Sequence, residues 1–391
     1  MLRIFCLLAI FAWTAAAHGQ PAPRVVFDVT LPQPEGLKID QSRAKFVLGA
    51  DGPRYLLRHY YTKSEYGNNR GDQHIDLVPI GPQGTAKPLP ALPLDKMRPD
   101  GFGIRSICGA VIASGDVVVF SSFNENDNAP KPPPVWRKGS ASLLRLAADG
   151  GLKTAAPVRP PGGREAEGYE FFHDINCLAT PDNAVILGGD YQSNGVWLAR
   201  LGLDGTKRWE TDAMITPLVV SSLGLRADGS LVSIIRDWDG YPYLQRHAPN
   251  GKALVDRRLK RTVDSTGILR QGVVLIGPID KAARASEVVF MDDAGGVLRR
   301  APWSFHENPW ADTLVAVGDG FVARVPAPGD NSEMNTIVRV NAQGKILWRT
   351  APIRADALAA AKTGEVIVLD TSERGGGKTW RLISYADPQT P

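Results

Sequence analysis

The 391-residue sequence predicts an all-β protein, a seven-bladed β-propeller whose four-stranded units form a closed ring. Three observations predict this fold. A short hairpin pattern recurs along the chain, and a second hairpin precedes each copy. An alternating segment near the N-terminus can also supply the one strand that the last unit lacks. Six or eight blades remain alternatives, because long loops extend the second and third units.

Residues 1–19 have the form of a secretory signal peptide. Arg3 gives a positive start, an apolar run follows over residues 4–13, and Ala15 to Ala17 offer a cleavage site. This run is short of the roughly 20 residues that span a bilayer. We therefore expect export to the periplasm or secretion, with residues 20–391 forming a single β-propeller domain.

Composition and charge exclude some classes of partner. The net charge is only +4, and no run of Lys and Arg suggests a nucleic-acid or membrane-binding patch. No later stretch is long and apolar enough to span a membrane. We expect a monomer that binds neither nucleic acid nor membrane.

The repeated hairpin is marked by a glycine in a tight turn. Turn dipeptides such as Asp-Gly, Asn-Gly and Gln-Gly stand at this point, because glycine tolerates a positive φ. The spacings between successive copies range from 44 to 66 residues. The turn glycines of the six copies are Gly84, Gly150, Gly205, Gly251, Gly295 and Gly344. Four copies have arginine five residues earlier, at Arg145, Arg200, Arg246 and Arg339.

Each unit is expected to contain strands a, b, c and d, with tight a–b and c–d turns. The last unit supplies strand a at 357–362, strand b at 365–370 and strand c at 379–385, and the chain then ends. Residues 24–30 alternate correctly for the missing strand d. The N-terminal strand should therefore pair with the last blade and close the ring, which removes open sheet edges.

The residues at 198–209 and 337–348 carry the clearest copies of the repeat, apolar-x-Arg-apolar-x-x-x-Gly-x-x-x-Trp. This pattern resembles the repeat of the quinoprotein-dehydrogenase-like (PQQ-like) propellers and is more loosely similar to WD40-like propellers. The resemblance implies that Trp209 and Trp348 lie on strand d and pack between blades. We find no quinone-binding or metal-binding signature, so the resemblance supports the fold and not an activity.

The connections at one face of the ring are long and irregular, whereas the a–b and c–d turns at the other face are short. Long loops on a rigid scaffold usually carry function. We therefore expect the binding surface on the long-loop face, where a protein or small-molecule ligand would bind. These loops include residues 61–73, 123–138, 158–174, 237–241, 304–312 and 327–335.

Candidate ligand-binding residues lie at the expected mouth of the central channel. A His beside a carboxylate can serve as an acid–base pair or a ligand anchor, and an Arg with carboxylates and an aromatic ring can hold an anionic or sugar-like ligand. The alternatives are a His bonded to loop backbone and ion pairs between blades. The candidates are Arg105, His173, Asp174, Arg236, Asp237, Trp238, His306 and Glu307.

No cofactor is predicted, although PQQ or Ca²⁺ remains open. Residues 124–128 and 330–333 offer oxygen ligands for Ca²⁺, but neither matches the spacing of an EF-hand loop, and polar turns are the simpler interpretation. Cys108 and Cys177 fall on strand a of neighbouring units, where they form either a disulfide or two buried thiols.

The functional hypothesis is an exported binding or protein-interaction platform. No nucleophile elbow, phosphate-binding loop, zinc-protease motif or haem-attachment motif occurs in the sequence. The alternative is an enzyme with a site at the channel mouth, either a quinone-dependent dehydrogenase or a lyase or hydrolase.

Overall fold

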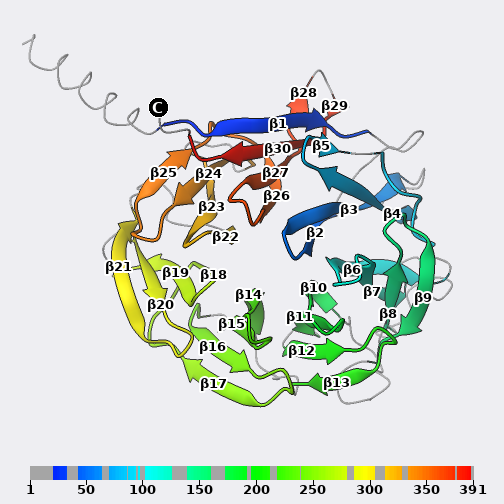
Figure 1. Cartoon of the computed structure of the whole chain (residues 1–391), viewed down its shortest axis with the longest axis horizontal. Helices are drawn as coiled ribbons and strands as arrows, with labels where there is room; N and C mark the ends of the chain where they lie inside the picture. The colour runs from blue at the N-terminus through cyan, green and yellow to red at the C-terminus, as the bar shows by residue number, and fades with distance from the viewer. Residues whose placement is uncertain are drawn as a thin grey trace, which may run out of the picture.

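A computed structural model shows strands arranged in sheets around a central axis, which is the arrangement of a β-propeller (Figure 1). The all-β prediction is confirmed. The structure describes residues 21–32, 43–63, 70–85, 87–93, 96, 102–125, 139–159, 172–191, 195–211, 218–237, 239–279, 286–303, 313–327, 333–374 and 377–388.

Five four-stranded sheets have antiparallel strands, and four of them follow chain order. The β10–β13 sheet has Phe172–Ala179, Val185–Tyr191, Gly195–Leu201 and Lys207–Glu210. The β14–β17 sheet has Leu218–Leu225, Leu231–Asp237, Pro242–His247 and Ala253–Arg258. The β18–β21 sheet has Ser265–Ile268, Val273–Pro278, Ser286–Met291 and Val297–Trp303. The β22–β25 sheet has Thr313–Val317, Gly320–Pro326, Asn335–Val340 and Ile346–Arg349.

The two N-terminal repeats share one eight-stranded sheet, in the order β5-β4-β3-β2-β6-β7-β8-β9. The strands are β2 (Arg43–Gly49), β3 (Gly52–Lys63), β4 (Arg70–Gly81), β5 (Gly84–Thr85), β6 (Phe102–Val111), β7 (Val117–Glu125), β8 (Gly139–Leu146) and β9 (Leu152–Pro157). The sequence predicts seven blades, whereas the hydrogen-bond ladders give five separate four-stranded sheets beside this eight-stranded one.

One parallel bridge, Leu48 to Ala110, joins the innermost strands of these two repeats. A glycine beside the bridge, Gly109, allows the close approach of the two strands. A Cβ added at Gly109 would lie 3.0 Å from a methyl group of Val47, which is tighter than an ordinary contact. A larger residue at position 109 would require Val47 to shift.

The N-terminal strand β1 (Arg24–Thr30) completes the sheet formed by the C-terminal strands. It pairs antiparallel with β30 (Arg381–Ala386), beside β27 (Val366–Asp370) and β26 (Ala355–Ala360). The predicted pairing of the N-terminal strand with the last unit is confirmed. A short hairpin, β28 (Glu373–Arg374) and β29 (Gly377–Lys378), forms a separate two-stranded sheet.

Hydrogen-bond ladders do not close the ring, because the described sheets meet mainly through side chains. At the junction between the two ends of the chain, the Lys362 N–H donates to the Asp51 carbonyl at 2.9 Å. A Cβ added at Gly84 would lie 2.7 Å from Val29 on β1. Packing of this kind, rather than a continuous ladder, brings the first and last sheets together.

Tryptophan side chains, one half-buried and one fully buried, fill spaces between neighbouring sheets. Trp209 stacks on His247 of the next sheet, with 5.9 Å between ring centres, and its Nε1 donates to the Pro249 carbonyl at 3.0 Å. Trp348 is fully buried, and its Nε1 donates to the Asp387 carboxylate at 2.7 Å. Both tryptophans lie on the outermost strand of one sheet and contact the next, as predicted.

Three of the four repeated arginines bind an aspartate in the a–b turn of their own repeat. Arg145 donates to Asp116 at 2.7 Å, and Arg246 contacts Asp228 at the same distance. Arg200 pairs with Asp182, whose pKa is lowered to about 2, first by a hydrogen bond from Thr180 and then by Arg200. These pairs connect the two tight turns of one repeat.

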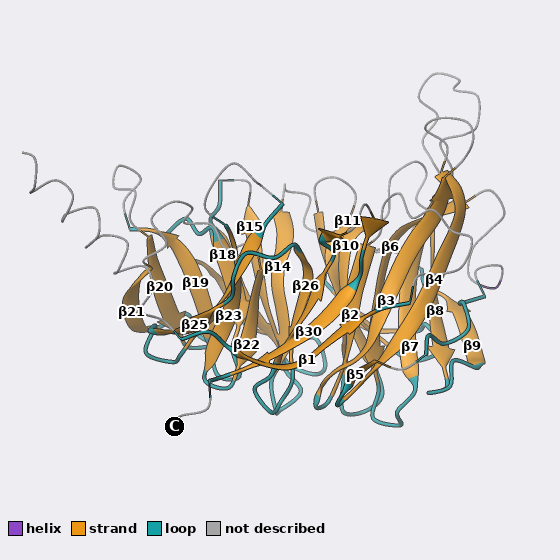
Figure 2. Ribbon diagram, turned by 90° about the horizontal axis from the view of Figure 1, so that it is seen from above, coloured by secondary structure: helices purple, strands orange, loops and turns teal. Residues whose placement is uncertain are grey.

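The short turns gather at one face, which we call the tight-turn face (Figure 2). The opposite face carries the b–c connections and the crossovers between units, and we call it the long-loop face. Within the described residues, no helix has the length and apolar character needed to cross a membrane. The same residues contain no group of three or more His, Cys, Asp or Glu side chains placed to hold a metal ion.

Candidate functional site

The structure describes the side chains of two of the eight sequence-predicted ligand-binding residues, Arg236 and Asp237. Arg105, His173 and Asp174 fall within β6 and β10, but their side chains lie outside the described part of the structure. The others, Trp238, His306 and Glu307, lie outside the described residues.

Arg236, near the end of β15, connects its sheet to the next one. Its Nη1 donates to the backbone carbonyl of Asp264 at 2.8 Å, just before the innermost strand β18 begins. The sequence left a ligand anchor and an inter-blade ion pair open for Arg236. The structure shows an inter-sheet hydrogen bond to a backbone carbonyl, and the ligand-anchor role of Arg236 stays a prediction.

Asp237 organises the turn between β15 and β16. One carboxylate oxygen accepts the Tyr241 backbone N–H at 2.8 Å, and the other accepts from Arg258 Nη2 at 3.0 Å. Gly240 has a φ of 82° in this turn, a conformation that glycine adopts without steric cost. The carboxylate thus fixes both the turn and the guanidinium at the end of β17.

Arg258 also lies against two tyrosine rings. Its guanidinium carbon is 4.8 Å from the ring centre of Tyr241 and 5.7 Å from that of Tyr243. The Arg258 side chain is 53% exposed, so the group is oriented by Asp237 and the rings while it stays accessible. Such cation–π contacts contribute roughly 0.5–1 kcal/mol at exposed sites.

Asp264 lies directly before the innermost strand β18 of the next sheet, where its backbone carbonyl accepts from Arg236. Its side chain is half-buried, and desolvation raises its pKa, against the opposing charges of Arg236 and Arg261. Its carboxylate makes no hydrogen bond to another described residue. The Oγ of the next residue, Ser265, is buried and has no hydrogen-bond partner in the described chain.

Arg261 fixes the crossover that positions Asp264. Its Nη1 donates to Glu287 Oε1 at 2.7 Å, and Arg300 donates to the same oxygen at 2.6 Å. Glu287 is only 8% exposed, and the two guanidinium groups compensate the negative charge of this buried side chain. The crossover is therefore tied to β20 and β21 of the next sheet.

The arrangement suits binding better than bond-making. Arg258, Tyr241 and Tyr243 present a cation and two aromatic faces on and beside the two outer strands of their sheet, whereas Asp264, whose pKa is raised by desolvation, lies next to the innermost strand β18. The described residues here include no nucleophile bonded to a base. Sequence reasoning missed Asp264, although it lies next to the start of an innermost strand, as His173 and Asp174 do.

Cys108 on β6 and Cys177 on β10 form a disulfide, with their Cα atoms 5.5 Å apart. The two strands are the innermost strands of neighbouring repeats. Both cysteines are buried within one apolar cluster that spans the two repeats. The sequence left this pairing open, because spacing alone does not give the distance between adjacent innermost strands.

Together, the sheets arranged around a central axis place the protein in the class of β-propellers. No protein-family model matches the chain. The search of curated proteins gives no match either.

Solved structures give similarity at the level of the fold. BBS1N, described in complex with ARL6DN, is 10% identical over 90% of this chain and 98% of its own, with a TM-score of 0.50. BamB from Moraxella catarrhalis is 13% identical over 93% of this chain and all of its own, with a TM-score of 0.45. Both are β-propellers. At such low identity the likeness to BBS1N shows the fold alone, and the looser superposition of BamB carries no further argument.

Proposed function

We propose that this protein is an exported, seven-bladed β-propeller that binds a partner protein through its long-loop face. The single observation that carries the proposal is the exposed Arg258, held by Asp237 and two tyrosine rings. Arginine and tyrosine dominate the energetics of protein interfaces when they are held in place. A preoriented guanidinium also loses little conformational entropy on binding.

The count of seven blades rests on the repeats within the eight-stranded sheet. Each half of that sheet has its own four strands in the a–b–c–d order of the other repeats. The turn glycines also make equivalent contacts with the preceding outermost strand, as Gly251 does with Trp209 and Gly84 does with Val29. The contact from β1 to Gly84 thus corresponds to the contacts between other neighbouring blades.

Export rests on the N-terminal sequence and the disulfide. Residues 1–19 have the pattern of a signal peptide, and residues 20–391 would form the mature propeller domain. Disulfides persist in oxidising compartments such as the periplasm and the cell exterior. The bond between Cys108 and Cys177 therefore supports either location.

A second candidate function is an enzyme at the channel mouth. The raised pKa of Asp264 and the unpartnered Ser265 Oγ favour it, because perturbed carboxyl groups cluster at catalytic sites. A quinone-dependent dehydrogenase, a lyase or a hydrolase would each need further groups. We rank this candidate below the interaction platform, since Arg258 and its tyrosines form the better organised surface.

The test is capture of partners from the native host with the tagged protein, in wild-type form and as Arg258→Glu. The matched control is Arg54→Glu on the tight-turn face, because the Arg54 side chain is 55% exposed and also pairs with an aspartate. We expect Arg258→Glu to lower recovery of a specific partner at least about tenfold, and the control to leave it unchanged.

Thermal unfolding must show that all three proteins fold equally well. Equal recovery by wild type and Arg258→Glu would contradict the proposed binding face. Measuring turnover with an Asp264→Asn variant, once a substrate is found, separates the enzymatic candidate from the platform.

A further inference from the structure

The β18–β21 sheet departs from the repeat at a pair of facing residues. In the β10–β13 sheet Arg200 faces Trp209, and in the β22–β25 sheet Arg339 faces Trp348. In the β18–β21 sheet the corresponding pair is Phe290 facing Arg299. The aromatic residue and the arginine have thus exchanged strands.

The a–b turn of the same sheet has also lost its acidic residue. Asp228, which precedes the turn glycine in the β14–β17 sheet, binds Arg246. The corresponding position here is Gln271, and Arg270 precedes it. The internal Arg–Asp pair that Arg145, Arg200 and Arg246 form in their sheets is therefore absent from this sheet.

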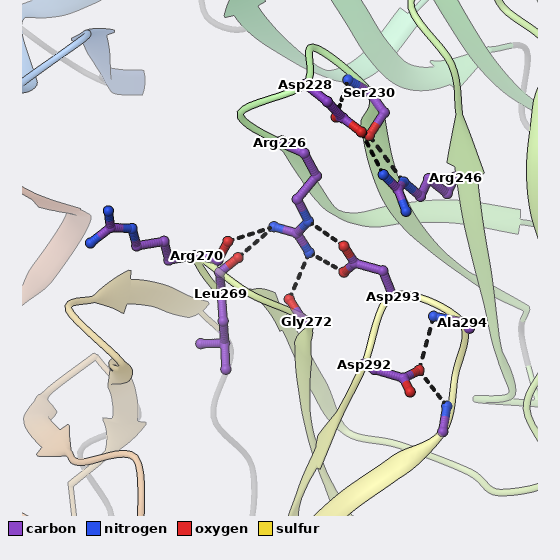
Figure 3. A network of polar contacts seen from close by, with 11 residues as sticks. Arg226, Asp228, Ser230, Arg246, Leu269, Arg270, Gly272, Asp292, Asp293 and Ala294 are labelled. Carbon is purple, nitrogen blue, oxygen red and sulfur yellow. Dashed lines mark hydrogen bonds and ion pairs between the residues drawn. The ribbon is translucent and has the colours of Figure 1, made fainter.

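Two guanidinium groups consequently remain available at the tight-turn face. Neither Arg270 nor Arg299 forms a side-chain hydrogen bond or ion pair with another described residue. Arg299 lies over the ring of Phe290, 4.2 Å from its centre. In Figure 3, the guanidinium of Arg270 points away from the neighbouring polar network.

A cavity of about 400 Å³ lies between these groups and the next sheet. Phe290, Met291 and Leu298 supply apolar walls, and Leu298 is 67% exposed. The turn between β22 and β23 supplies Asp319, the one carboxylate in the lining. The groove thus combines apolar surface with an excess of positive charge.

The turn that carries Arg270 is held in place by the preceding sheet. Arg226 donates to the carbonyls of Leu269 at 2.6 Å and Gly272 at 2.8 Å (Figure 3). The same guanidinium binds Asp293 in the turn between β20 and β21. These contacts fix the wall of the groove before any partner binds, which limits the entropy lost on binding.

The outermost strand β21 makes an extended peptide the occupant that fits best. One edge of β21 has no ladder partner among the described strands, so its backbone can pair with an added strand. Leu298 lies on this strand and also lines the cavity. A peptide lying along the edge would place its side chains against the groove.

We propose that this groove binds an extended segment of a partner protein in which an acidic side chain lies next to a large apolar one. The carboxylate would pair with Arg270 and Arg299, and the apolar side chain would cover the exposed Leu298 beside the cavity. This site lies on the face opposite Arg258 and is independent of the proposed long-loop surface.

The test selects binders from a phage-displayed library of random nine-residue peptides on the full-length protein. We expect enriched peptides to carry Asp or Glu beside Leu, Ile or Phe. Their dissociation constants should rise about tenfold or more with Arg270→Glu, which places a negative charge opposite the peptide carboxylate. The controls Arg54→Glu and Arg258→Glu should leave the affinity unchanged, which separates this site from the long-loop face.

A second variant restores the repeat and should close the groove. It combines Gln271→Asp, Phe290→Arg and Arg299→Trp, so that the turn and the facing pair match the β10–β13 sheet. We expect it to fold and to lose binding of the selected peptides.

Enrichment of neutral or basic peptides, or unchanged affinity in Arg270→Glu, would overturn the proposal. A third contradicting result would be that the groove binds a small amphiphile but no peptide. Octanoate would then shift the NMR signals of the Leu298 methyl groups, and none of the selected peptides would displace it.

Discussion

The disulfide between Cys108 and Cys177 should contribute strongly to stability. The bond joins residues 69 apart in sequence, so it restricts a long loop in the unfolded chain. The loop-entropy relation gives a stabilisation of about 4 kcal/mol for a loop of this length. For a mature chain of this size, that free energy corresponds to a shift of about 5 °C in the unfolding temperature.

The assay compares oxidised and reduced wild-type protein by denaturant unfolding followed with tryptophan fluorescence. Both cysteines are buried, so reduction requires transient unfolding before the comparison. The double variant Cys108→Ala and Cys177→Ala serves as a second measurement in which no bond can reform. We expect both forms without the bond to lose about 4 kcal/mol of unfolding free energy.

Agreement of the oxidised and reduced forms within about 1 kcal/mol would refute the loop-entropy reasoning. A variant that loses stability while the reduced wild type does not would point to lost packing in the apolar cluster instead. Titration of free thiols in the unfolded oxidised protein is the control for the state of the bond.

Three further predictions concern the site, the blade contacts and the closing strand. Asp264→Asn should raise the free energy of unfolding at pH 7, because the pKa of Asp264 is raised in the folded state and its ionisation therefore destabilises the fold. The gain should vanish below about pH 4, where the carboxyl group is protonated in both states, and a pH series of unfolding curves would show this. Trp348→Ala should lower the free energy of unfolding by about 3–5 kcal/mol, because a fully buried ring and its bond to Asp387 are lost; a loss below about 1 kcal/mol in denaturant titrations would contradict this packing role. Deletion of β1 (Arg24–Thr30) should expose the edge of β30 and cause aggregation, measured by light scattering, whereas a soluble monomer that unfolds like wild type would disprove the need for this strand.

Much of the fold could be predicted because the conformation of each tight turn depends on the few residues within it. A glycine such as Gly344, which has a φ of 79°, marks its turn without help from the rest of the chain. The alternating pattern of residues 24–30 likewise identified the strand that pairs with β30. The sheet shared by the first two repeats has no corresponding sequence pattern, because it depends on one backbone bridge between Leu48 and Ala110.

The site was less predictable, because its contacts cross between sheets. Asp237 was singled out from its neighbours in sequence, but its partner Arg258 is 21 residues away on another strand. Asp264 could not be predicted as a site residue, because its raised pKa comes from burial that only the packed structure provides. The exchange of Phe290 and Arg299 becomes visible once strand register aligns them with Arg200 and Trp209.

The most direct test of the proposed binding face is photo-crosslinking in the native host. A photoreactive p-benzoylphenylalanine would replace Tyr241 beside Arg258, and in a control it would replace the exposed Asn250 on the tight-turn face. We predict a specific crosslinked partner from position 241 that disappears when Arg258→Glu is added, and none from position 250. Equal crosslinking from both positions, or crosslinking from position 250 alone, would contradict the assignment of function to the long-loop face.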